Sequence, residues 1–211
     1  MIRPHAAHLT DLPADRSRRR HTQALRRRAA RLVRRLRSTD ADTADHSERV
    51  ARLSVRLGRR LGMGPVELAH LRRAARLHDV GKLMIPREIL QQPRALTPAE
   101  RGIVDRHAEI GADIVRGEHL PARESQWIRL HHVHYGRRGP AGPSGPRVPL
   151  AARILAVADA YDAMTHDRPY SPTMTHREAI TELRRCSGRQ FDPRLVDVFC
   201  QQPVPSEPAV A

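Results

Sequence analysis

Apolar residues recur every three or four positions through most of this chain, and this periodicity restricts its possible folds more than any other feature. Val50, Leu53 and Leu57 share one face of a helix, and Ile110 and Ile114 share another. No segment shows the sustained apolar–polar alternation of a half-buried strand, and no internal repeat is visible. We therefore predict an all-α fold. The predicted helices cover residues 22–36, 42–61, 65–78, 97–117, 123–134, 150–166 and 176–186, with a short last helix from residue 193.

Local signals mark where several of these helices begin and end. The run STDAD at 38–42 offers Ser, Thr and Asp as caps for the second helix. Thr97 precedes Pro98 and Glu100, which is the usual pattern of a capped helix start. Residues 136–149 contain four Gly and four Pro, so we expect a loop there.

Length and composition favour a single helical domain. The chain has 211 residues, of which 39% are hydrophobic and only 3% aromatic, so its core must consist mainly of Leu, Val, Ile and Ala. We expect residues 1–21 to be a disordered basic tail and residues 202–211 to be a Pro-rich tail. The domain between them, residues 22–201, is predicted to be one helical bundle.

Charge and apolar patterning exclude some classes of protein. No apolar run approaches the roughly 18 residues that a membrane span needs, and the N-terminus has no apolar core of a secretory signal. Cys186 and Cys200 have no metal-binding spacing, so we expect a reducing, cytoplasmic location. The net charge of +15 would attract polyanions or phosphorylated ligands. It is equally consistent with a coding preference for Arg and with solvated helix faces.

Five predicted helices each place a histidine or an aspartate on their apolar face. A single histidine on an apolar face is usually a core residue whose polar atoms are hydrogen-bonded. Five helices that each direct such a residue inward need another explanation. Inward carboxylates need compensation, and no Lys or Arg lies on those stripes. A divalent metal ion would provide it, and the set exceeds what one tetrahedral ion can use, so we predict a two-metal site. The inward residues are His46, His78, His107, His131 with His132, and Asp159 with Asp162.

The chemistry that suits such a site is hydrolysis of a phosphate ester, because two ions can share a bridging hydroxide and hold the attacking and leaving oxygens. Asp79 is the best candidate for a bridging ligand, since a carboxylate has two oxygens and His78 precedes it directly. Lys82 lies one helical turn beyond His78, close enough to direct an ammonium at a phosphate oxygen. Its alternative role is that of a solvated cation at a helix end.

Several short blocks in this chain resemble those of a known family. They are HSERVARL (46–53), LHDVGKL (77–83), HAEIG (107–111), HH (131–132) and VADAYDAMTHDRPY (157–170), followed by FDPRLVDVF near the C-terminus. Together they are similar to the HD-GYP branch of the HD-domain metal-dependent phosphohydrolases. The resemblance covers about residues 22–199, with the blocks in the family's order and spacing.

The resemblance implies an all-helical HD domain with two or three divalent ions, iron or manganese, between its helices, and hydrolysis of cyclic di-GMP to pGpG or GMP. Lys82 would contact phosphate, and Arg168 would hold the phosphate or guanine of the ligand. Asp42 occupies the position of a carboxylate that supports a third metal in some members, although it could equally cap its helix. The implied metal ligands are His46, His78, Asp79, His107, His131, His132 and Asp159.

The chain departs from the family pattern in the loop after the paired histidines. Val133 replaces the usual Glu, Gly136 and Arg137 replace Asp-Gly, and the tyrosine of the GYP motif is missing. The metal ligands are therefore complete while the segment that contacts the substrate is rewritten. Arg137 and Arg138 could hold a phosphate or be exposed loop charge.

These features give one leading function and three alternatives. We predict a phosphodiesterase of cyclic di-GMP or a related cyclic dinucleotide. Because the loop is altered, the alternatives are a phosphohydrolase of another nucleotide or phosphoester, and a degenerate binding module that keeps only the fold. Nucleic-acid binding ranks last, since the chain has only six Phe, Trp and Tyr residues for stacking.

The sequence gives fewer indications of protein partners. No sensory or receiver domain fits into the residues before the site, so we do not expect regulation by an attached domain. The basic N-terminus remains available for a protein partner, and the oligomeric state is not predicted.

Overall fold

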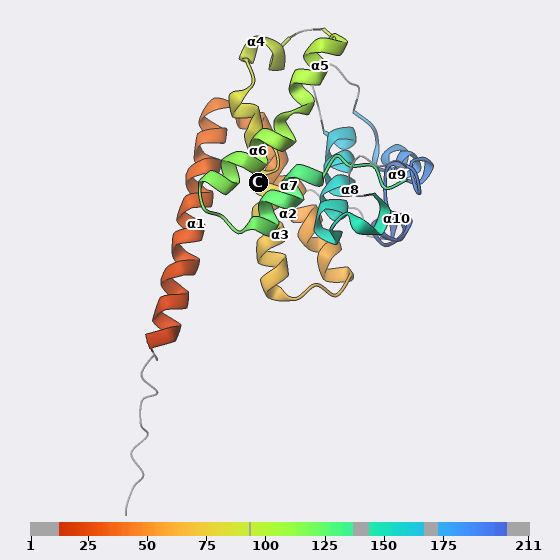
Figure 1. The fold of residues 1–211 in the computed structure, drawn as a ribbon. Coiled ribbons are helices and arrows are strands. Elements are labelled where there is room, and N and C mark those ends of the chain that lie inside the picture. Colours follow the sequence, from red (N-terminus) through yellow and green to blue (C-terminus); the bar gives the residue numbers. More distant parts are fainter. Residues whose placement is uncertain (1–12, 93, 137–143, 167–172, 202–211) are drawn as a thin grey trace, which may run out of the picture.

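The structure, a computed structural model, describes residues 13–92, 94–136, 144–166 and 173–201 and is built from helices (Figure 1). Within those ranges, the β pairing is a single isolated bridge between Ser187 and Phe191, so the all-α prediction is confirmed. The helices are α1 Pro13–Thr39, α2 Ala41–Arg60, α3 Pro65–Leu77, α4 Arg87–Leu90, α5 Pro98–Asp105, α6 His107–Gly117, α7 Ala122–Leu130, α8 Leu150–Thr165, α9 His176–Arg185 and α10 Pro193–Cys200, with 3-10 turns η1 Val80–Met84 and η2 Gly145–Arg147.

Side-chain caps set the starts of the helices as the sequence indicates. Asp40 accepts a hydrogen bond from the backbone N–H of Thr43 at 2.9 Å and begins α2. Thr97 and Glu100 form a reciprocal capping box at the start of α5. The same arrangement, which the sequence analysis did not single out, begins α9 with Thr175 and Glu178.

Helix α2 lies centrally and contacts α1, α3, α8 and α10. Helix α6 packs on η1 and α7, while α7 also contacts α3 and α8. The core consists mostly of Leu, Val, Ile and Ala, as expected, and Leu57, Leu71, Ile128 and Leu155 are fully buried. Helices α2 and α7 pack against α3, α6 packs on the turn η1 that follows it, and α8 packs against α2 and α7, so inward polar side chains from these elements come together. Helix α1 runs along one edge, and its N-terminal part extends away from the other helices (Figure 1).

The segment predicted as one helix over 97–117 is two helices, and that prediction was wrong. The break lies at Arg106, whose N–H bonds the Ile103 carbonyl three residues back at 3.3 Å. The His107 imidazole meanwhile donates from Nδ1 to the Val104 carbonyl at 2.7 Å, so a side chain competes for the backbone there. The interruption turns His107 inward and leaves Ile103 42% exposed.

Other boundaries also differ from the predictions. Helix α1 begins at Pro13, so residues 13–21 are helical where a disordered tail was expected, because Arg and Ala favour helix even without an apolar stripe. The helix predicted over 123–134 ends at Leu130, and the 3-10 turn η1 and the short α4 were not predicted. Residues 1–12 and 202–211 lie outside the described residues. Within the described part of the chain, no helix combines the length and hydropathy needed to cross a bilayer.

Gly81 allows η1 to touch α6, and Gly81→Ala tests that contact. A Cβ at this position would lie 2.0 Å from the His107 carbonyl oxygen and 2.7 Å from the Gly111 nitrogen, both backbone atoms. We expect a loss of stability of about 1–3 kcal/mol, typical of overpacking, and a Tm lowered by roughly 2–4 °C per kcal/mol in thermal denaturation.

Gly102→Ala is the matched control, since a Cβ there meets nothing within 4 Å. Gly102 lies within α5, so alanine should leave Tm unchanged or raise it, given its helix preference of about 0.5–1 kcal/mol. Equal melting temperatures for the Gly81 variant and the wild type would contradict the close contact.

Candidate metal centre

The predicted ligands converge from five helical elements onto one buried site. Their ligand atoms form three overlapping groups, and within each group the atoms lie within 4.8 Å of one another. His78 belongs to two of the groups and His131 to two, so the groups form a continuous cluster. The groups are His46, His78 and Asp79; His78, His131 and Asp159; and His107, His131 and His132.

Three of the histidines are held in the same way. Each imidazole donates from Nδ1 to the backbone carbonyl three residues earlier, which fixes the ring and leaves the lone pair of Nε2 facing the interior. All three side chains are buried. The bonds run from His78 to Ala75 at 2.8 Å, from His107 to Val104 at 2.7 Å and from His131 to Ile128 at 2.6 Å.

The inward nitrogens fit a divalent cation. Nε2 of His46, His78 and His131 are buried and have no hydrogen-bond partner. Buried polar atoms without partners are costly, and imidazole nitrogens with free lone pairs are metal ligands. Nε2 of His107 lies 3.2 Å from Nε2 of His132, a spacing that one shared cation would satisfy. The donor set of imidazoles and carboxylates therefore matches the predicted metal site.

Asp79 lies among three of the histidines and turns its two oxygens to different ones. Oδ1 lies 3.3 Å from Nε2 of His107, while Oδ2 lies 3.5 Å from Nε2 of His78 and 3.7 Å from Nε2 of His46. Lys82 Nζ donates to Oδ2 at 2.7 Å. Burial alone would raise the pKa of Asp79, but the charges of Lys82 and of the nearby histidines hold it well below its usual range. The carboxylate is therefore ionised, as a ligand must be.

Asp159, on α8, is the second carboxylate of the cluster. Its Oδ1 lies 3.0 Å from Nε2 of His46 and 3.7 Å from Nε2 of His78. Burial disfavours the charge on Asp159, but the close approach of these two imidazoles holds its pKa well below the usual range. Burial also opposes protonation of His46, yet the neighbouring carboxylates of Asp159 and Asp162 raise the pKa of His46 to about 9. Burial lowers the pKa of both His107 and His131, which favours the neutral imidazole that a metal ligand requires.

Asp162 orients His46, a role that the sequence analysis did not assign. Its Oδ2 accepts from Nδ1 of His46 at 2.7 Å, and Arg49 donates to both carboxylate oxygens. The only signal in the sequence was its place three residues after Asp159 on the inward stripe. The expectation that no Lys or Arg compensates the inward carboxylates was wrong, because Arg49 pairs with Asp162 and Lys82 with Asp79.

The remaining predicted residues have separate outcomes. Asp42 is exposed in the first turn of α2 and belongs to none of the ligand groups found among the described residues. It is not the cap either, because Asp40 caps α2. Arg137, Arg138 and Arg168 lie outside the described residues. Their predicted contacts with substrate stay predictions, as does the third metal at Asp42.

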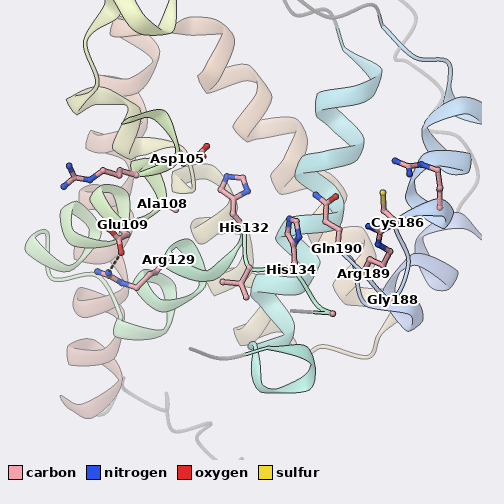
Figure 2. A pocket seen from close by; sticks show the side chains of 14 residues that line it. Asp105, Ala108, Glu109, Arg129, His132, His134, Cys186, Gly188, Arg189 and Gln190 are labelled. Atoms are coloured by element: carbon pink, nitrogen blue, oxygen red, sulfur yellow. Dashed lines mark ion pairs between the residues drawn. The ribbon is translucent and has the colours of Figure 1, made fainter. Parts of the chain in front are cut away.

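Two neighbouring cavities lead outward from the cluster. The first, about 580 Å³, is lined by His131, His132 and Asp159. The second, about 960 Å³, shares His132, Val133 and His134 with the first and extends to the turn between α9 and α10. Figure 2 shows this second cavity with His132 and His134 between its two sides. The first cavity therefore opens onto three of the candidate ligand residues, and the second adjoins it.

Comparisons with known proteins agree with this geometry. Residues 19–195 match the family model described as HD domain. The chain is 36% identical over 163 residues to a cyclic di-GMP phosphodiesterase of Thermotoga maritima, covering 76% of this chain and 44% of that protein. It is 31% identical over 163 residues to 3'3'-cGAMP-specific phosphodiesterase 2 of Vibrio cholerae, covering 76% of this chain and 31% of that protein.

A solved structure shows the same fold. It is Bd1817, an HDG"Y"P protein from Bdellovibrio bacteriovorus, with a TM-score of 0.62 at 22% identity, covering 77% of this chain and 52% of that one. The chain spans less than half the length of the two relatives above. The matched model, the relatives and the ordered motif blocks together establish that this chain belongs to the HD-domain family.

Proposed function

We propose that this chain is a metal-dependent phosphodiesterase that hydrolyses cyclic di-GMP or a related cyclic dinucleotide to a linear product. The observation that carries the proposal is the placement of Asp79, whose two oxygens face separate imidazoles within a buried cluster of metal-ligating groups. The relatives named as cyclic di-GMP and 3'3'-cGAMP phosphodiesterases support the substrate class.

The ligand groups suit two divalent ions that share Asp79. His46 and His78 lie nearest to Oδ2 of Asp79, and His107 lies nearest to Oδ1. Asp159 adjoins His46, while His131 and His132 form a ligand group with His107. Imidazole with carboxylate is a donor set that accommodates iron or manganese. When bound, such ions would polarise a phosphoryl oxygen and lower the pKa of a water molecule to supply the nucleophile.

The chain's own residues would orient the substrate and balance its charge. Lys82 Nζ lies beside Asp79 Oδ2, and its side chain is 20% exposed, so the ammonium can also reach a non-bridging phosphate oxygen. Asp162 holds Nδ1 of His46 and so keeps Nε2 directed at the site. Hydrogen bonds to backbone carbonyls fix the imidazole rings of His78 and His131, so these rings should keep their orientation during turnover.

A screen for hydrolysis tests this proposal. Protein purified anaerobically, with its metal content measured, is incubated with Mn²⁺ or Fe²⁺ and with cyclic di-GMP, 3'3'-cGAMP, linear nucleotides or bis(p-nitrophenyl) phosphate. We expect about two ions per chain, consistent with a shared-carboxylate site, and conversion of at least one cyclic dinucleotide to a linear product.

A second candidate function is hydrolysis of a different nucleotide, which the rewritten loop favours. Val133 and Gly136 replace the Glu and Asp of the family pattern, and the tyrosine that would offer a surface to a guanine base is missing. Metal-loaded protein that cleaves linear nucleotides but no cyclic dinucleotide would support this alternative and contradict the first. Protein that binds neither metal nor nucleotide substrate would instead indicate a degenerate module.

A further inference from the structure

The larger cavity beside the metal centre has one wall that the metal site does not require. Figure 2 shows Arg129 and Glu109 on one side and Cys186, Arg189 and Gln190 on the other. Its volume of about 960 Å³ lies within the range of about 300–1,000 Å³ that small-molecule sites occupy.

The wall on the α9–α10 side is held to the loop that follows the paired histidines. The backbone N–H of Tyr135 donates to the Gln190 carbonyl at 3.0 Å, and that of Gly136 donates to the Arg189 carbonyl at 2.7 Å. A Cβ on residue 136 would lie 2.5 Å from the Gly188 carbonyl oxygen, so only glycine permits this approach. The residue that departs from the family pattern is therefore the one that brings Arg189 to the cavity.

Two arginines along the cavity, Arg106 and Arg189, have no ion pair among the described residues. Arg106 adjoins Asp105 in the chain, whereas no acidic residue lines the side on which Arg189 lies. Arg129 bonds Asp113 at 2.7 Å and lies 3.8 Å from Glu109, and Arg185 bonds Glu182. Arg189 makes no side-chain hydrogen bond or ion pair with the residues that the structure describes. Asp105 and Glu109 are the acidic residues of the described lining, both on the side away from Arg189.

We propose that Arg189 binds the second phosphodiester of a cyclic dinucleotide, the one that is not being hydrolysed. This inference rests on the proposed function. A cyclic dinucleotide carries two phosphodiester anions, and when one lies at the metal centre the other must lie elsewhere in the site. A guanidinium is suited to it because its fork of N–H donors matches two phosphate oxygens. The bond from Gly136 holds the backbone of Arg189, so only the exposed side chain of Arg189 has to be ordered when the ligand binds.

Arg189→Ala tests this assignment with two substrates. We expect kcat/KM for cyclic di-GMP, or for 3'3'-cGAMP if that is the better substrate, to fall by about tenfold, the scale of one lost hydrogen bond to a charged group. Bis(p-nitrophenyl) phosphate has a single phosphodiester, so its kcat/KM should fall much less. The Kd of cyclic di-GMP, measured by calorimetry, should rise by a similar factor.

Two further variants separate a specific contact from a general effect. Arg177→Ala removes an exposed arginine of α9 that does not line the cavity. It should leave kcat/KM unchanged for both substrates. Gly136→Ala should displace the turn at 186–191 and weaken cyclic dinucleotide binding without removing any charge.

The outcomes distinguish this inference from the function on which it rests. If the wild type cleaves a cyclic dinucleotide and Arg189→Ala cleaves and binds it equally well, the inference is wrong and the function stands. If both substrates lose activity to the same extent, Arg189 is not a contact to the second phosphate. If the wild type neither binds nor cleaves a cyclic dinucleotide, both are wrong.

Discussion

Asp79→Asn is expected to reduce phosphodiester hydrolysis by about 10³-fold or more, the scale reached when a single electrostatic contact to a reacting group is lost. The carboxylate faces His107 with one oxygen and His78 with the other, so its charge serves both halves of the cluster. Asparagine keeps the shape but offers one neutral oxygen and an NH₂ group that cannot coordinate a cation. Metal content by elemental analysis should therefore fall together with kcat.

The fold should survive this substitution. Asp79 lies at the junction of α3 and η1, and no hydrogen bond from its side chain caps η1. Asp197→Asn on the exposed face of α10 is a matched control that should change neither metal content nor turnover. Circular dichroism would confirm that both variants are folded. A variant at Asp79 that keeps its metal and its turnover would show that the carboxylate does not bridge.

The helices could be predicted because their signals are local. Each capping signal involves residues within one helical turn of each other. The structure has helix starts at two of them, Thr97 with Glu100 and the caps at 38–42. The break at Arg106 was not predictable in this way. It depends on the hydrogen bond from the His107 imidazole to the Val104 carbonyl and on the packing of Gly81 against His107. Both are properties of the folded state.

In the candidate site, too, local features could be predicted from the sequence and contacts between distant residues could not. Histidines on apolar faces were recognised because helical spacing determines a face without knowledge of the partner helix. The bond between His46 and Asp162 joins residues 116 positions apart, so no local pattern reveals it. Arg49 was overlooked for the same reason, because its carboxylate partner lies on α8. Inward charge could thus be located from the sequence, while its compensation could not.

The cavity wall at Arg189 needed the structure most of all. In the sequence, Gly136 is only a departure from a motif, and Arg189 is one of many arginines. Its relevance follows from two backbone bonds between segments more than 50 residues apart. A substitution that removes a familiar motif residue can therefore also create a close contact that the motif would have prevented.

Paired substitutions at the two ends of the ligand cluster would determine how many ions it holds. His46 belongs only to the group at one end, and His132 only to the group at the other. If two ions share Asp79, His46→Gln and His132→Gln should each lower the metal content by about one ion per chain and reduce turnover by at least about 100-fold, since even residues that merely support ligands cost 10–100-fold. His21 is an exposed histidine on α1, and His21→Gln is the control. It should change neither the metal content nor the turnover.

The alternative is one ion at the centre of the cluster, and the same variants test it. A single ion held by His78, His131 and Asp159 would make neither His46 nor His132 a direct ligand. Both variants would then retain the full metal content of the wild type, and the two-ion proposal would be wrong.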